Sequence, residues 1–255
     1  MFEATRDGAE APLADQAQRG AAAEPSCAAA LAQAWRGLGL LERLAALRSH
    51  ISGRIVFTTS FGLEDQAIAH AIFAQNLALE VVTLDTGRLF PETHQVWAET
   101  EARYGARIHL SAPGQDALEA LITRDGINGF RSSVTARLDC CAVRKVAPLN
   151  RALSGCAAWI TGIRADQSAE RAGLGLVSFD SQRRLIKANP LFDWTREATF
   201  AFVRAHGVPY NALHDRGFLS IGCAPCTRAV ALGEPERAGR WWWEQAEKKE
   251  CGLHL

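Results

Sequence analysis

The sequence lacks the features that mark membrane proteins and nucleic-acid-binding proteins. Its 255 residues include 28 basic and 28 acidic side chains, so the formal net charge is zero. A chain without excess positive charge has no general attraction for nucleic acid or for an anionic membrane surface, and any anion site must be local. No apolar run approaches the roughly 18 residues that a membrane span needs. We therefore expect neither nucleic acid nor a membrane among the partners.

The N-terminus also lacks the apolar segment of a secretory signal peptide, because Glu3, Asp7 and Glu10 fall where that segment would lie. We expect a cytoplasmic protein, in which the seven cysteines are thiols, metal ligands or redox groups, since structural disulfides rarely persist in a reducing compartment. Residues 1–24 show no apolar periodicity and are expected to be mobile. Residues 25–255 are expected to form one domain with a C-terminal tail from about residue 244.

Four of the seven cysteines occur in two pairs. Cys140 and Cys141 are adjacent, and Cys223 and Cys226 form a Cys-x-x-Cys turn with a proline inside it. Such a turn can present two thiolates to one metal centre, although alone it is equally consistent with a redox pair. The adjacent pair favours a compact iron-sulfur cluster over zinc, because zinc sites usually place about two to four residues between paired cysteines.

The other three cysteines divide into two kinds. Cys27 and Cys156 lie among alanines and are expected to be small buried hydrophobic residues. Cys251 is the fifth residue from the C-terminal end, where no core is expected, and it follows two lysines and precedes His254. An exposed thiol among cations can have a lowered pKa and act as a nucleophile. An incidental tail cysteine is the alternative interpretation.

Strands and helices are predicted to alternate through the middle of the chain. An apolar, β-branched run at residues 54–59 indicates a buried strand, and residues 79–84, 106–110 and 157–162 are also predicted to be strands, with helical segments between them. The polar stretch 131–139 indicates a turn, after which a helix is expected to start at Cys140 and end near Leu153. This alternation predicts an α/β fold with a doubly wound parallel sheet. The small-residue loop after the first strand, residues 60–66, leaves backbone N–H groups free for an anion, although an ordinary strand-to-helix turn is also possible. Loops at the carboxyl ends of such strands bind nucleotides.

Six short motifs occur in the order found in one enzyme family. They are Ser60–Asp65, Leu84–Gly87, Cys140-Cys141 with Arg144-Lys145, Thr161–Arg164, Cys223–Cys226 and Glu250–His254. Together they resemble assimilatory adenylyl-sulfate reductases, and the resemblance covers roughly residues 30 to 255. It implies a fold of the adenine nucleotide α-hydrolase-like type, with an iron-sulfur cluster insertion and a mobile C-terminal tail.

The resemblance also implies roles for individual residues. One four-iron, four-sulfur cluster would be held by Cys140, Cys141, Cys223 and Cys226, and Cys251 would be the nucleophile. The substrate-binding positions would be Ser60, Phe61, Gly62, Leu63, Glu64, Asp65, Leu84, Asp85, Lys145, Gly162, Arg164, Arg237, Arg240 and His254. The first loop departs from the related Ser-Gly-Gly-x-Asp-Ser motif at Phe61 and at residues 63–66. This departure fits loss of ATP cleavage with retention of nucleotide binding.

The implied activity is reduction of adenosine 5'-phosphosulfate to sulfite and AMP in assimilatory sulfate reduction. Thioredoxin or a similar thiol donor would act on an S-sulfonate of Cys251, and a homo-oligomer is expected. Guanidinium groups suit this substrate because their planar donors match sulfonyl and phosphate oxygens. The alternatives are a 3'-phosphoadenylyl-sulfate reductase, a nucleotide-dependent iron-sulfur tRNA-thiolating enzyme, which the neutral charge disfavours, and a metal-stabilised binding module. For Arg237 and Arg240 the alternative is a solvated helix face. His214 is expected to be structural, and a supporting role for the cysteine turn that follows it is left open.

Overall fold

The computed structural model describes residues 24–245 and 250–253. The expectations for residues 1–23 and for His254 therefore lie outside the described residues. No helix within the described ranges is long and apolar enough to cross a membrane.

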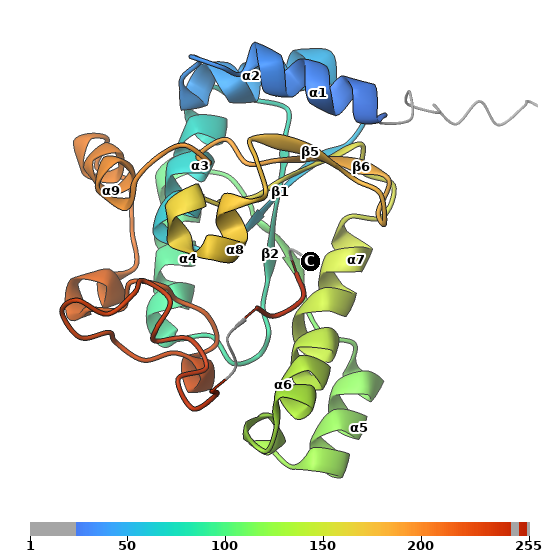
Figure 1. Ribbon diagram of the computed structural model, residues 1–255, viewed down its shortest axis with the longest axis vertical. Coiled ribbons are helices and arrows are strands. Elements are labelled where there is room, and N and C mark those ends of the chain that lie inside the picture. The colour runs from blue at the N-terminus through green and yellow to red at the C-terminus, as the bar shows by residue number, and fades with distance from the viewer. Residues whose placement is uncertain (1–23, 246–249, 254–255) are drawn as a thin grey trace, which may run out of the picture.

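A six-stranded sheet forms the centre of the molecule, in the order β3-β2-β1-β4-β6-β5 (Figure 1). The strands are β1 (Ile55–Thr59), β2 (Glu80–Leu84), β3 (His109–Ser111), β4 (Ala158–Ile160), β5 (Val177–Asp180) and β6 (Leu185–Ala188). All neighbours run parallel except the edge strand β5, which forms an antiparallel hairpin with β6. The predicted parallel sheet is confirmed.

Helices cover both faces of this sheet (Figure 1). They are α1 (Pro25–Ala34), α2 (Leu40–His50), α3 (Leu63–Ala74), α4 (Pro91–Tyr104), α5 (Gln115–Asp125), α6 (Val134–Cys141), α7 (Ala147–Ala152), α8 (Ala169–Ala172) and α9 (Arg196–Ala205). Successive side chains of a strand point to opposite faces. Ile55 and Phe57 of β1 accordingly pack into the larger core with α1, α2, α3, α4 and α9, whereas Val56 packs with Leu149 of α7 in the smaller core.

The helix that carries Cys140 and Cys141 differs from the expectation. The sequence predicts that this helix starts at the cysteine pair, but α6 begins at Val134, where the Ser133 hydroxyl caps it by accepting a hydrogen bond from the Ala136 N–H at 3.1 Å. After Cys141 the chain continues through a π-helical segment, Ala142–Val146, into α7. Such π segments often occur at functional sites, and this one lies directly after the cysteine pair.

Candidate active site

A cavity of about 180 Å³ lies at the carboxyl ends of the central strands, where parallel sheets bind nucleotides. Its lining includes Ser60 from the loop after β1, Leu84 at the end of β2, and Thr161 and Gly162 after β4. Three βα units that are far apart in sequence therefore meet at one site, as the strand-loop motifs predict.

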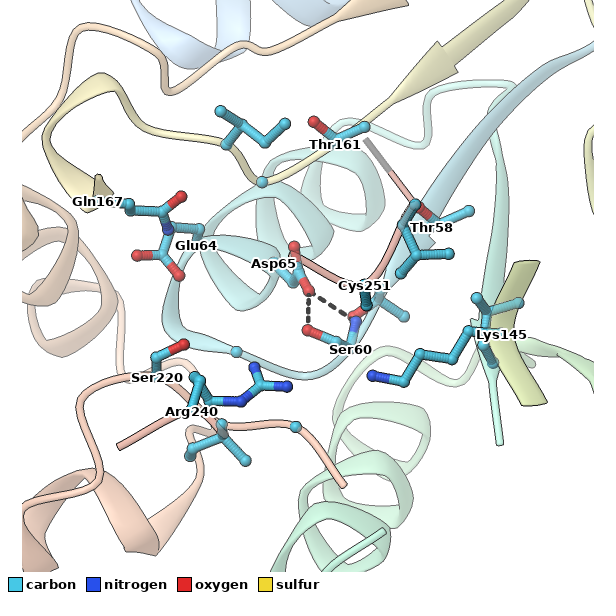
Figure 2. A pocket seen from close by; sticks show the side chains of 18 of the residues that line it. Thr58, Ser60, Glu64, Asp65, Lys145, Thr161, Gln167, Ser220, Arg240 and Cys251 are labelled. Carbon is cyan, nitrogen blue, oxygen red and sulfur yellow. Dashed lines mark hydrogen bonds between the residues drawn. The ribbon is translucent and has the colours of Figure 1, made fainter. Parts of the chain in front are cut away.

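The loop between β1 and α3 is held by its own carboxylate. The backbone N–H and the hydroxyl of Ser60 both donate to Asp65 Oδ2, at 2.6 and 2.7 Å (Figure 2). Burial raises the pKa of Asp65 to about 6, although these hydrogen bonds oppose the shift. Gly162 lies so close that an added Cβ would be 2.3 Å from Asp65 Oδ1. Glycine is therefore required at position 162 to keep this arrangement.

Phe61 is the point where this loop departs from the glycine-rich form. Its φ angle is 58°, a conformation that costs energy for a bulky residue. The ring is buried and stacks on Trp97 with centroids 5.6 Å apart. Packing in the core thus compensates for the strained backbone, and the side chain does not line the cavity.

Four cations line the same cavity, which suits it to an anionic ligand. Lys145, Arg171, Arg237 and Arg240 all contribute to the lining. Figure 2 shows the charged ends of Lys145 and Arg240 directed into the space beside Ser60. Burial, together with the neighbouring Arg171 and Arg240, lowers the pKa of Arg237 to about 10. Burial opposes the charge of Lys145, yet the thiolate forms of Cys223 and Cys251 outweigh it and raise the pKa of the lysine.

Cys251 also lines this cavity, but it is not the exposed thiol that its position near the terminus suggests. It is 8% exposed and packs against Cys141 and Trp241, so the exposure expected from the sequence is wrong. Residues 250–253 lie against the body of the protein, where the Cys251 thiol is buried beside the cations. Cys27 and Cys156, expected to be buried, are only half-buried.

The two cysteine pairs meet around a second, smaller cavity next to the first. Cys140, Cys141, Cys223 and Cys226 all line it, and Cys223 lines both cavities. Burial raises the pKa of Cys141 to about 12 and that of Cys226 to about 11. Burial acts on Cys223 in the same direction, but Lys145 and a contact with the Thr86 hydroxyl at 3.2 Å lower its pKa.

This arrangement fits a cluster better than a single ion. Within the described ranges, no three His, Cys, Asp or Glu residues are arranged to hold one metal ion. Four thiols around one cavity instead match the cysteine ligand set of a four-iron cluster. The same cavity is lined by Arg144, Arg240 and Trp241, whose Nε or Nε1 atoms are buried without a hydrogen-bond partner in the described part of the chain. Cluster sulfides are acceptors that would satisfy these donors.

Other residues predicted to bind substrate point elsewhere. Leu63 is fully buried in the larger core, and Asp85 lies outside the cavity lining and contacts His94 at 3.0 Å. Arg164 also lies outside the lining: it is 0% exposed and forms ion pairs with three carboxylates. Its guanidinium makes four hydrogen bonds to these carboxylates, which leaves at most one of its five N–H donors, so the described structure does not support Arg164 as a substrate contact.

Several lining residues were not among the predicted site residues. Arg171 lies on α8, Glu236 lies beside the predicted Arg237, and Glu250 begins the last of the six motifs. His214 was expected to be structural, with support of the cysteine turn left open. Its Nδ1 contacts the Phe218 carbonyl at 2.8 Å, while its Nε2 is buried at the cavity without a partner among the described residues. Only its place shortly before the cysteine turn marks it in the sequence.

Comparison with known proteins identifies the family of this chain. Residues 54–229 match the model of the phosphoadenosine phosphosulfate reductase domain. A protein of Agrobacterium fabrum named adenosine 5'-phosphosulfate reductase is 53% identical over 219 residues, which cover 86% of this chain and 84% of that protein. A protein of the same name from Rhizobium meliloti is 53% identical over 218 residues, covering 86% and 82%.

A solved structure agrees with this match. The crystal structure of phosphoadenylyl-sulfate reductase from Candida auris, a phosphate complex, is 26% identical and superposes with a TM-score of 0.67 over 80% of this chain and 96% of that one. The range matched by the family model, residues 54–229, contains all six strands and the loops after β1, β2 and β4 that line the cavity. The chain therefore belongs to the phosphoadenosine phosphosulfate reductase family.

Proposed function

We propose that the protein reduces adenosine 5'-phosphosulfate to sulfite and AMP, with Cys251 as the nucleophile and thioredoxin or a similar thiol as the electron donor. The observation that carries this proposal is that the Cys251 thiol lines the same cavity as Lys145, Arg237 and Arg240. The relatives that are 53% identical are named for this activity.

The cavity supplies what a thiolate needs to attack a sulfated nucleotide. The nucleotide lies against the loop of residues 60–65, and the cations neutralise the sulfonyl and phosphate oxygens. Cys251 Sγ attacks the sulfur atom, an S–S bond forms, and the bond from sulfur to the phosphate oxygen breaks, so that AMP leaves with the electron pair. A donor thiolate then attacks Cys251 Sγ and releases sulfite. The second thiol of the donor frees Cys251 as the donor disulfide forms.

Cys140, Cys141, Cys223 and Cys226 are proposed to hold one four-iron, four-sulfur cluster. When bound, such a cluster supplies a compact anionic centre. Lys145 and Arg240 line both cavities, so they would be held between that centre and the substrate oxygens. Protein purified without oxygen should be brown and contain about four irons. Stoichiometric zinc without visible absorption would contradict this assignment.

Mass spectrometry tests the role of the nucleophile. Incubation with adenosine 5'-phosphosulfate and no reductant should add one sulfonate to the peptide that contains Cys251. Cys251→Ser should abolish the adduct and turnover while iron content and AMP binding persist, and Cys156→Ser serves as the matched control. An adduct on Cys27 or Cys156, or sulfite release by the Cys251→Ser variant at the wild-type rate, would refute the proposal.

The substrate is tested by comparing two nucleotides. We expect a higher kcat/KM with adenosine 5'-phosphosulfate than with its 3'-phosphorylated form, measured as sulfite and AMP release in the presence of thioredoxin. An equal or higher value with the 3'-phosphate would instead support a 3'-phosphoadenylyl-sulfate reductase. The expected homo-oligomer stays a prediction, which light scattering would measure.

A further inference from the structure

One buried arginine contacts the chain on both sides of residues 246–249, the segment that leads to Cys251. Arg137 lies on α6 and is 1% exposed. Its Nε and Nη2 atoms donate to the Glu244 carboxylate at 2.7 and 3.0 Å, and its Nη1 donates to the backbone carbonyl of Glu250 at 2.5 Å. The guanidinium also lies over the Trp241 ring, 4.5 Å from its centroid.

These contacts fix the position of Cys251 relative to the cysteine pair. Arg137 precedes Cys141 by four residues on the same helix, so the two side chains lie on one helix face. Cys141, Trp241 and Cys251 pack together beside this face. A planar guanidinium holds its partners in a defined geometry, and the carbonyl that it binds belongs to the residue directly before Cys251.

The tail has a second attachment of a different kind. The Glu250 carboxylate pairs with Arg171 and Arg237, both at 3.1 Å. These two arginines line the larger cavity, so an anionic substrate competes with Glu250 for them. Arg137 lines the smaller cysteine cavity and not the larger one, so its contacts with the tail remain available when substrate is bound.

We propose that Arg137 is a positioning residue for Cys251, which ties the Glu250 carbonyl to Glu244 and to α6 and so keeps the thiol in the substrate cavity. The proposal rests on the proposed role of Cys251 as nucleophile. It assigns no contact with substrate to Arg137. Loss of this arginine should therefore slow the attack of the thiol without weakening nucleotide binding.

The test compares Arg137→Lys, which keeps the charge but loses the planar set of donors, with the wild-type holoprotein. Two rates are measured: alkylation of Cys251 by iodoacetamide, with Cys27 as the internal reference, and single-turnover formation of the S-sulfonate. We expect alkylation to be faster and sulfonation slower, each by roughly tenfold, the factor that corresponds to about 1.4 kcal/mol. AMP affinity, measured by calorimetry, should stay within about twofold of the wild type, about 0.4 kcal/mol.

Arg43→Lys is the matched control, because Arg43 is also buried and donates to a carboxylate, that of Asp193, and to a backbone carbonyl, that of Pro190, but lines neither cavity. It should leave Cys251 alkylation at the wild-type rate. Glu244→Gln decides the outcome if Arg137→Lys misfolds or loses iron, because Glu244 lines neither cavity. It should change both rates in the same direction by a smaller factor.

Unchanged alkylation and sulfonation rates in Arg137→Lys, or in Glu244→Gln where that variant decides, would overturn the proposal. A fall in AMP affinity equal to the fall in sulfonation rate would also overturn it, because it would place Arg137 in substrate binding. If the wild type forms no S-sulfonate, the proposed function fails. The alkylation ratio then still shows whether Arg137 holds the tail.

Discussion

Replacing Arg164 by methionine tests whether one buried cation joins the loops around the cavity. Arg164 Nε donates to Glu64 at 2.7 Å and Nη2 donates to Glu236 at 2.7 Å, while Nη1 pairs with Asp166. Glu64 lies in the first turn of α3, next to Asp65, which holds the loop before this helix through its hydrogen bonds with Ser60. Glu236 directly precedes Arg237. A single guanidinium thus connects the nucleotide loop with the segment that carries two of the cavity cations.

The structure sets the size of the expected loss. Removing one partner of a buried ion pair costs about 3–5 kcal/mol, because an uncompensated charge stays buried. The side chains of Glu64 and Glu236 are only 12% and 14% exposed, whereas that of Asp166 is 43% exposed and can be hydrated. We expect the free energy of unfolding to fall by roughly 4 kcal/mol at pH 8. This is a large share of the free energy of unfolding of a typical native protein, which is roughly 5–15 kcal/mol.

The pH dependence separates this account from a simple packing defect. Burial opposes ionisation of Glu64, but Arg164 outweighs it and holds the pKa below its ordinary value of 4.5. In the wild type this contribution is present above pH 4.5 and is lost as the pH falls through the folded pKa. Without Arg164, burial raises the pKa of Glu64 and further raises that of Glu236. The folded variant then binds protons that the unfolded chain has released. The difference in free energy of unfolding between the wild type and Arg164→Met should therefore shrink as the pH falls toward 5.

Urea unfolding followed by tryptophan fluorescence at pH 8 and pH 5.5 measures both effects. Arg216→Met is the matched control, because Arg216 pairs with Glu92 on the surface, where the two side chains are 62% and 31% exposed. Such a pair contributes about 0–1 kcal/mol. A loss below about 1 kcal/mol for Arg164→Met at pH 8 would refute the reasoning, as would an equal loss at both pH values.

Three further changes test the cavity. The pKa of Asp65 is about 6 in the folded protein and ordinarily 3.8, so the free energy of unfolding of the wild type should fall as the pH rises from about 4 to 6. In urea titrations, Asp65→Asn should remove about 3 kcal/mol of this pH-dependent fall. Equal pH profiles for the two proteins would count against this prediction. Gly162→Ala places a Cβ 2.3 Å from Asp65 Oδ1 and should weaken AMP binding by about 1–3 kcal/mol in calorimetry. Gly114→Ala, which has open space around the added Cβ, should leave AMP binding unchanged. Equal AMP affinities of the two variants would show that the close contact at position 162 does not affect binding. Lys145→Met should lower kcat/KM by about 10²-fold or more in the sulfite assay, and a value near that of the wild type would remove Lys145 from the reaction.

Local patterns predicted the central fold correctly, because their signals lie within a few residues of the elements concerned. The apolar runs of β1, β2 and β4, each followed by small or polar residues, predicted the strands and placed three loops at one sheet edge. The polar stretch before Cys140 was assigned to a turn instead of α6. In the folded protein this stretch is helical, and its Arg137 is buried in a hydrogen bond with Glu244, 107 residues away. No local sequence pattern contains that pairing.

The sequence alone reveals which chemical groups the protein has: two pairs of cysteines, a thiol near the C-terminus, and basic residues suited to an anion. Tertiary structure decided which way each group points. Arg164 and Arg237 were both predicted to bind substrate, yet Arg164 is turned toward Glu64, 100 residues away, and Glu236, while Arg237 lines the cavity. Cys251 was likewise expected to be exposed because of its place near the C-terminal end, but it is buried in the folded protein. The physical reason is that the direction and burial of a charged or reactive side chain depend on partners that only the folded chain brings together.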